Sequence, residues 1–209
     1  MTRNQVVYSF ILLFISVSAL LLQSCSVYKT LANIGRLQYK LNGAGNITVA
    51  GISLSGKNSV SDFNARDILS FTSAVAKGNL PISFILNVDA KNPNTGSGGF
   101  PRTNASIEEF PFRLVINGTE VLQGDIASSF TVPGTGETSV IPLSISFDLV
   151  QTFKSKSYES LLNIALSLAG IGSGNSSVEL FAQPTIRTEF GSMTAPNEIR
   201  IIDTQFSDR

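Results

Sequence analysis

Residues 82–90 read Ile-Ser-Phe-Ile-Leu-Asn-Val-Asp-Ala, and this stretch decides the fold class. Every second residue from Ile82 to Ala90 is apolar, and the residues between them are mostly polar. Successive side chains of a β-strand point to opposite faces. The alternation therefore predicts a strand with one face in a core and the other in water.

The same period of two recurs along most of the chain. We expect further strands at residues 47–54, 110–116, 119–121, 130–132, 141–149, 178–188 and 198–206, with a bulge at Ala50-Gly51 in the first of them. Asn117-Gly118 predicts a two-residue hairpin, because both central positions of a type I′ turn need positive φ. Roughly eight short strands with polar alternate faces predict a mainly β fold, an antiparallel β-sandwich.

Two segments follow a helical period instead. Asn64 is a candidate N-cap for a helix that ends near Lys77, with Ile68, Phe71 and Val75 on one stripe. A second helix is expected from Ser157 to Gly170, with its apolar residues at Leu161, Leu162, Ala165, Leu168 and Ala169. We interpret both as helices that close the sandwich; amphipathic helices that bind a partner are the alternative.

The first 25 residues differ from the rest of the chain. A single charge, Arg3, precedes the apolar stretch Val6–Leu22, and Gln23-Ser24-Cys25 follows. This layout is typical of a signal peptide. Residues 22–25 resemble a bacterial lipobox, in which the Cys thiol is acylated and the peptide is cut just before it, between Ser24 and Cys25. The alternative is an uncleaved anchor, since a spanning helix needs roughly 20 apolar residues.

Cys25 is the only cysteine of the chain, and acylation would account for it without a free thiol. Two or more acyl chains hold a protein stably on a membrane. We therefore expect residues 1–24 to be a lipoprotein signal peptide, 25–42 the lipidated cysteine and a tether, and 43–209 the folded domain. Ser26 rather than Asp follows the cysteine, which favours the outer membrane, on its periplasmic side, over retention at the inner membrane.

The composition excludes several classes of function. Without His, and with one Cys, the chain has no Ser-His-Asp or Cys-His catalytic arrangement and no His-ligated or multi-Cys metal site. Lys and Arg number 15, as do Asp and Glu, and no run of like charge exceeds Glu108-Glu109. No basic surface for nucleic acid is therefore expected. We predict a protein that is not an enzyme and holds no cofactor or metal.

The remaining polar candidates have ordinary structural explanations. Asn92-Pro93-Asn94 is interpreted as a turn rather than a cation site, because Asn in turns usually bonds nearby backbone. Asp89 and Glu108-Glu109 are expected in separate elements, so no acid/base pair is assigned to them. The glycines between 170 and 174 predict a flexible loop, since no strand precedes them as a phosphate-binding loop requires.

The segment from Leu80 to Leu149 carries a resemblance to a known family. It contains an apolar strand ending in Asn92-Pro93-Asn94, a strand that leads to Asn117-Gly118, then Gly124, the loop after Phe130-Thr131-Val132-Pro133, and the aliphatic strand from Val140 to Ile145. This order resembles the late embryogenesis abundant (LEA) subgroup 2 domain, also called the water stress and hypersensitive response (WHy) domain, here in a lipoprotein of Bacteroidetes type. The resemblance implies an immunoglobulin- or fibronectin-like sandwich with one or two short helices, a role in stress response, and no catalytic residues.

Two classes of function remain open. The first is a non-enzymatic lipoprotein of the cell envelope, held to the membrane by acyl chains on Cys25, whose sandwich binds or protects an envelope protein or lipid. The second is a carrier of a lipid or small hydrophobic ligand in a pocket between sheet and helix. A continuous cavity lined by Phe84, Phe112 and Phe147 would favour the carrier, and a close-packed interior the binding module.

The lipobox assignment predicts the behaviour of one variant. Cys25→Ala removes the thiol that accepts the diacylglycerol, so the variant should lose acyl labelling and accumulate as the uncleaved precursor. Metabolic labelling with an alkyne fatty acid, together with gel mobility, measures both effects. Normal processing of Cys25→Ala would contradict the assignment.

Overall fold

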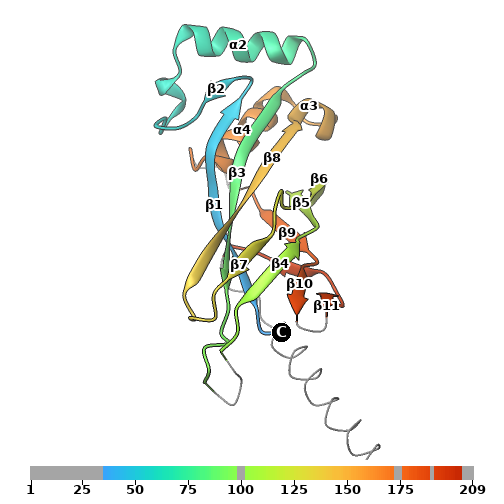
Figure 1. The fold of residues 1–209 in the computed structure, drawn as a ribbon. Helices are drawn as coiled ribbons and strands as arrows, with labels where there is room; N and C mark the ends of the chain where they lie inside the picture. Colours follow the sequence, from blue (N-terminus) through green and yellow to red (C-terminus); the bar gives the residue numbers. More distant parts are fainter. Residues whose placement is uncertain (1–34, 98–101, 172–175, 189–190, 204–209) are drawn as a thin grey trace, which may run out of the picture.

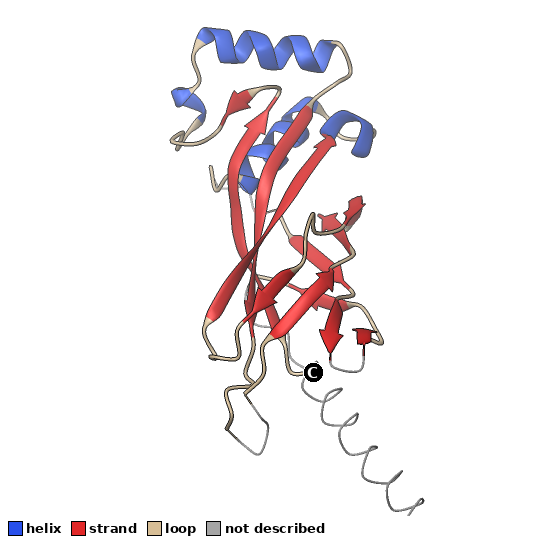
Figure 2. Ribbon diagram, in the orientation of Figure 1, coloured by secondary structure: helices blue, strands red, loops and turns tan. Residues whose placement is uncertain are grey.

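A computed structural model describes residues 35–97, 102–171, 176–188 and 191–203 of the chain. These residues form three antiparallel sheets of four strands (Figure 2). The strands are β1 (Gln38–Val49), β2 (Ile52–Ser53), β3 (Pro81–Lys91), β4 (Ala105–Glu109), β5 (Phe112–Ile116), β6 (Thr119–Gly124), β7 (Phe130–Val132), β8 (Thr138–Asp148), β9 (Val178–Ala182), β10 (Thr185–Thr188), β11 (Gly191–Thr194) and β12 (Ile199–Ile201). The helices are a 3-10 turn (Val60–Asp62), α2 (Ala65–Ala76), α3 (Leu149–Thr152) and α4 (Tyr158–Leu168).

Sheet A has the order β2-β1-β3-β8, with β3 at its centre. β3 and β8 pair without a register shift, from Pro81 opposite Asp148 to Lys91 opposite Thr138. Along β3 the residues from Ile82 to Ala90 alternate between buried and partly exposed, which confirms the strand predicted from their sequence. The inner face of sheet A is thus apolar, and its outer face faces solvent.

Sheets B (β11-β10-β4-β7) and C (β12-β9-β5-β6) are two halves of one bent sheet. β4 continues into β5, and β9 continues into β10. The paired strands β4 and β10 of sheet B are therefore continuous with the paired strands β5 and β9 of sheet C. Both crossings contain a proline, Pro111 and Pro184, which lacks the N–H that a regular ladder needs. The Gln183 N–H still donates to the Pro111 carbonyl (3.0 Å), so the two crossings remain hydrogen-bonded at the bend.

A side chain replaces a backbone partner at this bend. The Asp125 carboxylate accepts from the Phe110 N–H (2.6 Å) and from the Ile126 N–H (2.7 Å). Phe110 is fully buried, and its amide would be costly to leave without an acceptor. Asp125 thereby joins the connection between β6 and β7 to the point where β4 turns into β5.

The two layers enclose one hydrophobic core. Tyr39 of β1 packs against Phe110 with ring centroids 5.4 Å apart, and both rings are fully buried. Sheets B and C lie beside the lower half of sheet A in Figure 1, and α4 lies behind its upper half. Leu161 and Ala165 of α4 belong to the same core, which confirms that this helix closes the sandwich. The fold is mainly β, as the sequence predicts.

Three sequence expectations need correction. Residues 38–42, assigned to the tether, lie in β1, and Tyr39 there is fully buried. Ala50-Gly51 is not a bulge but a two-residue turn, since Val49 pairs with Ile52 and both turn residues have positive φ (48° and 77°). The bulges of β1 lie earlier, between Leu41 and Ala44 and between Gly45 and Thr48. The predicted strand 178–188 is divided at Pro184 into β9 and β10.

Helix α2 lies across the end of sheet A opposite the start of β1 (Figure 1). Asn64 caps it as predicted: its side chain accepts from the Asp67 N–H (2.9 Å), and the Asp67 carboxylate accepts from the Asn64 N–H (3.2 Å). This reciprocal pair is a capping box. The four-residue α3 was not expected from the sequence.

The Ala50-Gly51 turn predicts a stabilising substitution. Ala50 has a φ of 48°, close to the 51° of Asn117 in the second two-residue turn. Asn tolerates this region better than Ala, so Ala50→Asn should raise the free energy of unfolding by about 0.5–1 kcal/mol. Urea unfolding with an unchanged m-value measures the gain. Asn117→Ala should lower stability by more than this gain, because it also removes the hydrogen bonds of Asn117 with Ser176 and Ser177; a loss of stability in Ala50→Asn would refute the turn assignment.

Candidate functional site

The predicted processing site lies outside the described residues. This holds for Ser24, Cys25 and the apolar stretch Val6–Leu22, so lipidation stays a prediction. Within the described residues, no helix is long and apolar enough to cross a membrane.

The Asn-Pro-Asn sequence forms a buried junction. The Asn92 amide donates to the Thr103 carbonyl (2.8 Å) and to the Val132 carbonyl (3.1 Å), and its side-chain oxygen accepts from the Asn94 N–H (3.1 Å). Both Asn side chains are buried. The interpretation as a turn is confirmed, and the amide of Asn92 additionally ties the end of β3 to the residues before β4 and to the end of β7.

Gly134 completes this junction by close backbone approach. A Cβ at this position would lie 2.6 Å from the Thr103 carbonyl oxygen and 2.7 Å from that of Asn94. The Gly134 N–H donates to the side chain of Asn104 (3.0 Å). The polar groups here bond one another, which indicates a structural role for the junction.

The carboxylates considered from the sequence do not form a catalytic pair. Asp89 on sheet A accepts from the amide of Asn42 (2.9 Å). Glu108 on sheet B accepts from the Ser192 hydroxyl and forms an ion pair with Arg187. The Ser192 hydrogen bond, followed by Arg187, lowers the pKa of Glu108 and keeps it ionised. No group of three or more metal-binding side chains gathers within the part of the chain that the structure describes.

The phenylalanines proposed to line a cavity are packed. Phe84 and Phe147 meet edge to face, with ring centroids 6.4 Å apart. Phe112 lies on sheet C, where its ring fills the space above Gly124: a Cβ there would approach Phe112 Cζ to 2.8 Å. This packing favours a close-packed interior between the sheets.

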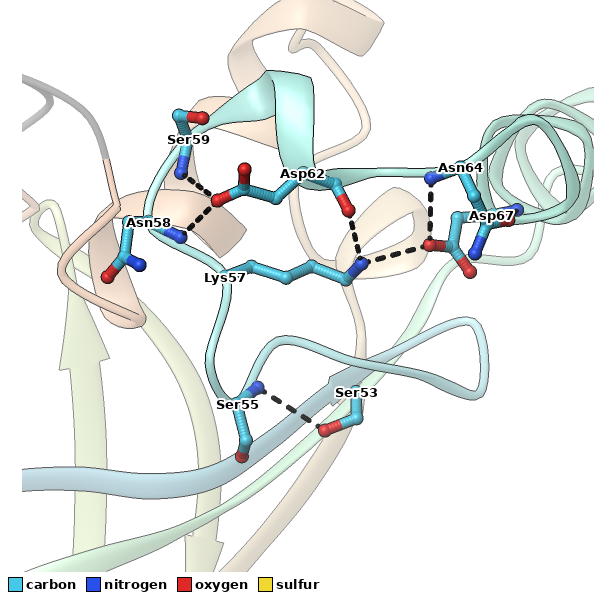
Figure 3. A network of polar contacts seen from close by, with 8 residues as sticks. All are labelled: Ser53, Ser55, Lys57, Asn58, Ser59, Asp62, Asn64 and Asp67. Carbon is cyan, nitrogen blue, oxygen red and sulfur yellow. Dashed lines mark hydrogen bonds and ion pairs between the residues drawn. The ribbon is translucent and has the colours of Figure 1, made fainter.

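A polar network holds the N-terminal end of α2 (Figure 3). The Lys57 ammonium donates to the Asp62 carbonyl (2.9 Å) and to the Asp67 carboxylate (3.0 Å). The Asp62 carboxylate accepts from the N–H groups of Asn58 (2.8 Å) and Ser59 (3.1 Å). These bonds occupy both carboxylates of this segment.

Both carboxylates of this network have lowered pKa values. Backbone N–H donation, from Asn58 first and then Ser59, lowers the pKa of Asp62 below its usual value. The hydrogen bond from Lys57 lowers the pKa of Asp67. A carboxyl with a lowered folded-state pKa stabilises the fold above its usual pKa, and this contribution disappears only as the pH falls through the lowered value.

Two large apolar side chains of α2 are exposed. Ile68 is 57% exposed and Leu69 is 71% exposed, whereas Val75 is the buried residue of the helix. Ile68 shares one stripe with Phe71 and Val75, as its spacing predicts, but only Val75 on this stripe is buried. The adjacent apolar residues 68 and 69 were the sign of this exposure in the sequence. Adjacent residues point in different directions around a helix, so a single contact face does not readily bury both.

A groove of about 490 Å³ runs beside this exposed side. One wall is α2, and the other is formed where the β1–β2 turn meets the start of β3. The lining residues are Ala50, Leu69, Ser70, Ser73, Ala74, Lys77, Asn79 and Pro81. The Ala50 N–H donates to the Pro81 carbonyl (2.8 Å), which fixes the floor between the two strands. The groove is shallow and open to solvent over most of its surface.

A second hollow, of about 230 Å³, lies between the Asn117-Gly118 turn and α4. Its lining is polar except for Ile164: Asn117, Lys156, Ser160, Asn163, Ser167 and Ser176. Several of these groups bond one another, as the Asn117 amide does with the Ser176 hydroxyl (3.3 Å). The groove beside α2 is therefore the better candidate for an apolar ligand.

Comparisons with known proteins do not identify a family. No protein-family model and no curated protein matches the chain. Two solved structures share partial similarity, each with a TM-score of 0.31. A crystal structure of a protein from Archaeoglobus fulgidus is 12% identical over 57% of this chain and 82% of its own. A solution structure of an Arabidopsis thaliana protein is 17% identical over 59% of this chain and 73% of its own.

The Asn92 junction predicts a large loss of stability on substitution. Asn92→Ala leaves the Thr103 and Val132 carbonyls without their donor in a buried site, so the free energy of unfolding should fall by about 2–3 kcal/mol. The matched control is Asn42→Ala, which removes a single exposed hydrogen bond to Asp89 and should change stability by less than about 1 kcal/mol. Equal effects of the two changes in urea unfolding would contradict the central role of Asn92.

Proposed function

We propose that this protein is a lipid-anchored, non-enzymatic envelope protein whose LEA subgroup 2-like sandwich acts as a binding or stress-protective module. The observation that carries the proposal is the pair of exposed large apolar side chains on α2, Ile68 and Leu69. Both are far more exposed than large apolar residues usually are, and Leu69 lines the open groove beside the helix. Such adjacency is typical of a binding surface.

The direction of the chain supports this choice of surface. The stretch from Cys25 to Gln38, fully extended, reaches about 45 Å at most. β1 then runs 12 residues, about 40 Å, toward the end that carries α2 (Figure 1). A lipid on Cys25 would thus hold the start of β1 near the membrane and present α2 away from it. We place the anchor at the outer membrane, on its periplasmic side.

The polar groups support a binding module over an enzyme. Among the described residues the buried Asn92 and Asn94 are committed to the junction, and Asp89 and Glu108 lie on different sheets with their own partners. Catalysis by proton transfer needs a positioned acid or base within reach of a substrate site. The groove beside α2 has one ionisable lining residue, Lys77, and no carboxylate among its described lining residues.

A carrier of a small hydrophobic ligand is the second candidate. The packing of Phe84 against Phe147 argues against a ligand between the sheets. The groove beside α2 also lies between a helix and a sheet, and part of its lining is apolar: Ala50, Leu69, Ala74 and Pro81. A carrier function would therefore use α2 rather than α4.

The proposal predicts that substitutions at α2 separate function from folding. In cells that depend on this protein for survival of osmotic or drying stress, the double change Ile68→Ser with Leu69→Ser should abolish the survival benefit without changing acylation or protein level. Both side chains are exposed, so stability should change by about 0.5 kcal/mol or less. Val140→Ser, at an exposed apolar residue on β8, is the matched control and should retain the benefit. Full survival of the double variant would overturn the assignment of this surface.

A further inference from the structure

We infer that Asn42 is a site of spontaneous deamidation, and that this modification weakens β1 as the protein ages. Gly43 follows Asn42 in the sequence. Asparagine before glycine is especially reactive in this chemistry, because glycine has no side chain to hinder attack by its backbone nitrogen. The inference goes beyond the proposed function, and it depends neither on the surface of α2 nor on lipidation of Cys25.

The reaction needs only water and the atoms of these two residues. The backbone nitrogen of Gly43 attacks Cγ of Asn42, and a new C–N bond closes a cyclic succinimide. The bond from Cγ to Nδ2 breaks, the proton of the attacking N–H passes through solvent to the leaving nitrogen, and ammonia departs. Water then opens the succinimide at either carbonyl, which gives aspartate or isoaspartate. In isoaspartate the main chain runs through the side-chain carboxyl carbon and is one methylene longer.

The strand ladder is irregular at these two residues. The pairing of β1 with β3 shifts register between Leu41 and Ala44, so Asn42 and Gly43 form a bulge opposite a single residue of β3. Both residues are exposed, and a Cβ built on Gly43 would have no atom within 4 Å. Asn42 is held there by the hydrogen bond from its Nδ2 to Asp89 Oδ1 (2.9 Å), on the solvent-facing side of sheet A. An exposed bond of this kind opens readily, which leaves Cγ within reach of the Gly43 nitrogen.

The other Asn-Gly pair of the chain, Asn117-Gly118, is held more firmly. The Asn117 N–H donates to the Ser177 carbonyl (3.0 Å), and its side-chain oxygen accepts from the Ser177 N–H (3.0 Å). Its side-chain amide also donates to the Ser176 hydroxyl (3.3 Å). Both Asn-Gly pairs are exposed, so the difference in hydrogen bonding, rather than access of water, should decide which one reacts.

Either product of the reaction weakens the start of β1. Aspartate at position 42 replaces an amide donor with a carboxylate that faces Asp89, and like charges so close together are destabilising. Isoaspartate lengthens the main chain directly after Leu41, which is buried together with Tyr39. The inserted methylene therefore disturbs the part of β1 that supplies these two side chains to the core.

Incubation of the full-length protein, purified from membranes in detergent, tests the inference. The protein is kept at mildly alkaline pH in water enriched in heavy oxygen, which labels every carboxylate formed by opening of a succinimide. Peptide mass spectrometry should find the label at residue 42, in the tryptic peptide of residues 41–57. Labelling at residue 117 should be about tenfold slower, because more hydrogen bonds must open before the ring can close.

Controls separate the structure from the local sequence. In urea the bonds that restrain Asn117 are lost, so both Asn-Gly pairs should react at rates within about twofold of each other. Asn42→Gln keeps an amide donor, but its side chain closes a larger ring far more slowly, so this variant should keep its melting temperature during the incubation. Asn42→Asp should have a lower melting temperature from the start. Adding Asp89→Asn exchanges donor and acceptor and should restore most of the loss.

Two results would overturn the inference. Labelling of Asn42 no faster than that of Asn117 in the folded protein would contradict the assignment of the site. An unchanged melting temperature in Asn42→Asp, or in the incubated protein once residue 42 has reacted, would contradict the effect on β1. Neither result bears on the surface of α2, which the survival assay with Ile68 and Leu69 tests separately.

Discussion

The buried amide of Asn92 is the interaction on which the arrangement of the two layers depends. β3 is the central strand of sheet A, and the chain leaves it at Asn92 to enter sheet B at β4. Asn92 bonds the Thr103 carbonyl just before β4 and the Val132 carbonyl at the end of β7, both away from solvent. The Asn92 side chain therefore supplies a donor to two backbone carbonyls, one before β4 and one at the end of β7, where no strand ladder does so.

The second layer depends on a bend at which the regular hydrogen bonds of the strand ladder are interrupted. Pro111 and Pro184 lie where neighbouring strands cross from sheet B to sheet C, and the Asp125 carboxylate accepts from Phe110 in place of a backbone carbonyl. The bend lets one four-stranded sheet wrap around the core residues Tyr39 and Phe110.

Local signals in the sequence predict much of this fold. The Asn64-Asp67 capping box and the Asn117-Gly118 turn involve residues within a few positions of each other, and the structure confirms both. Non-local features were less predictable. The exposure of Ile68 depends on how far α2 stands from the sheet, and the division at Pro184 depends on its pairing across the bend. The groove could not be predicted, because residues 50 and 81 meet Leu69 and Lys77 only after β1, β3 and α2 are assembled.

The way α2 is held explains why Leu69 can remain exposed. Val75 anchors the helix near its C-terminal end, while the N-terminal end depends on polar bonds among Lys57, Asp62 and Asp67. A helix fixed by burial alone would turn its most apolar side toward the core, since burial of Leu or Ile is worth about 1.5–3 kcal/mol. Phe71, Ala74 and Val75 turn one side of α2 toward the core, and the capping box and the Lys57 bonds hold its N-terminal end. Leu69 lies on another side of the helix and is 71% exposed, so it adds little buried surface to the fold.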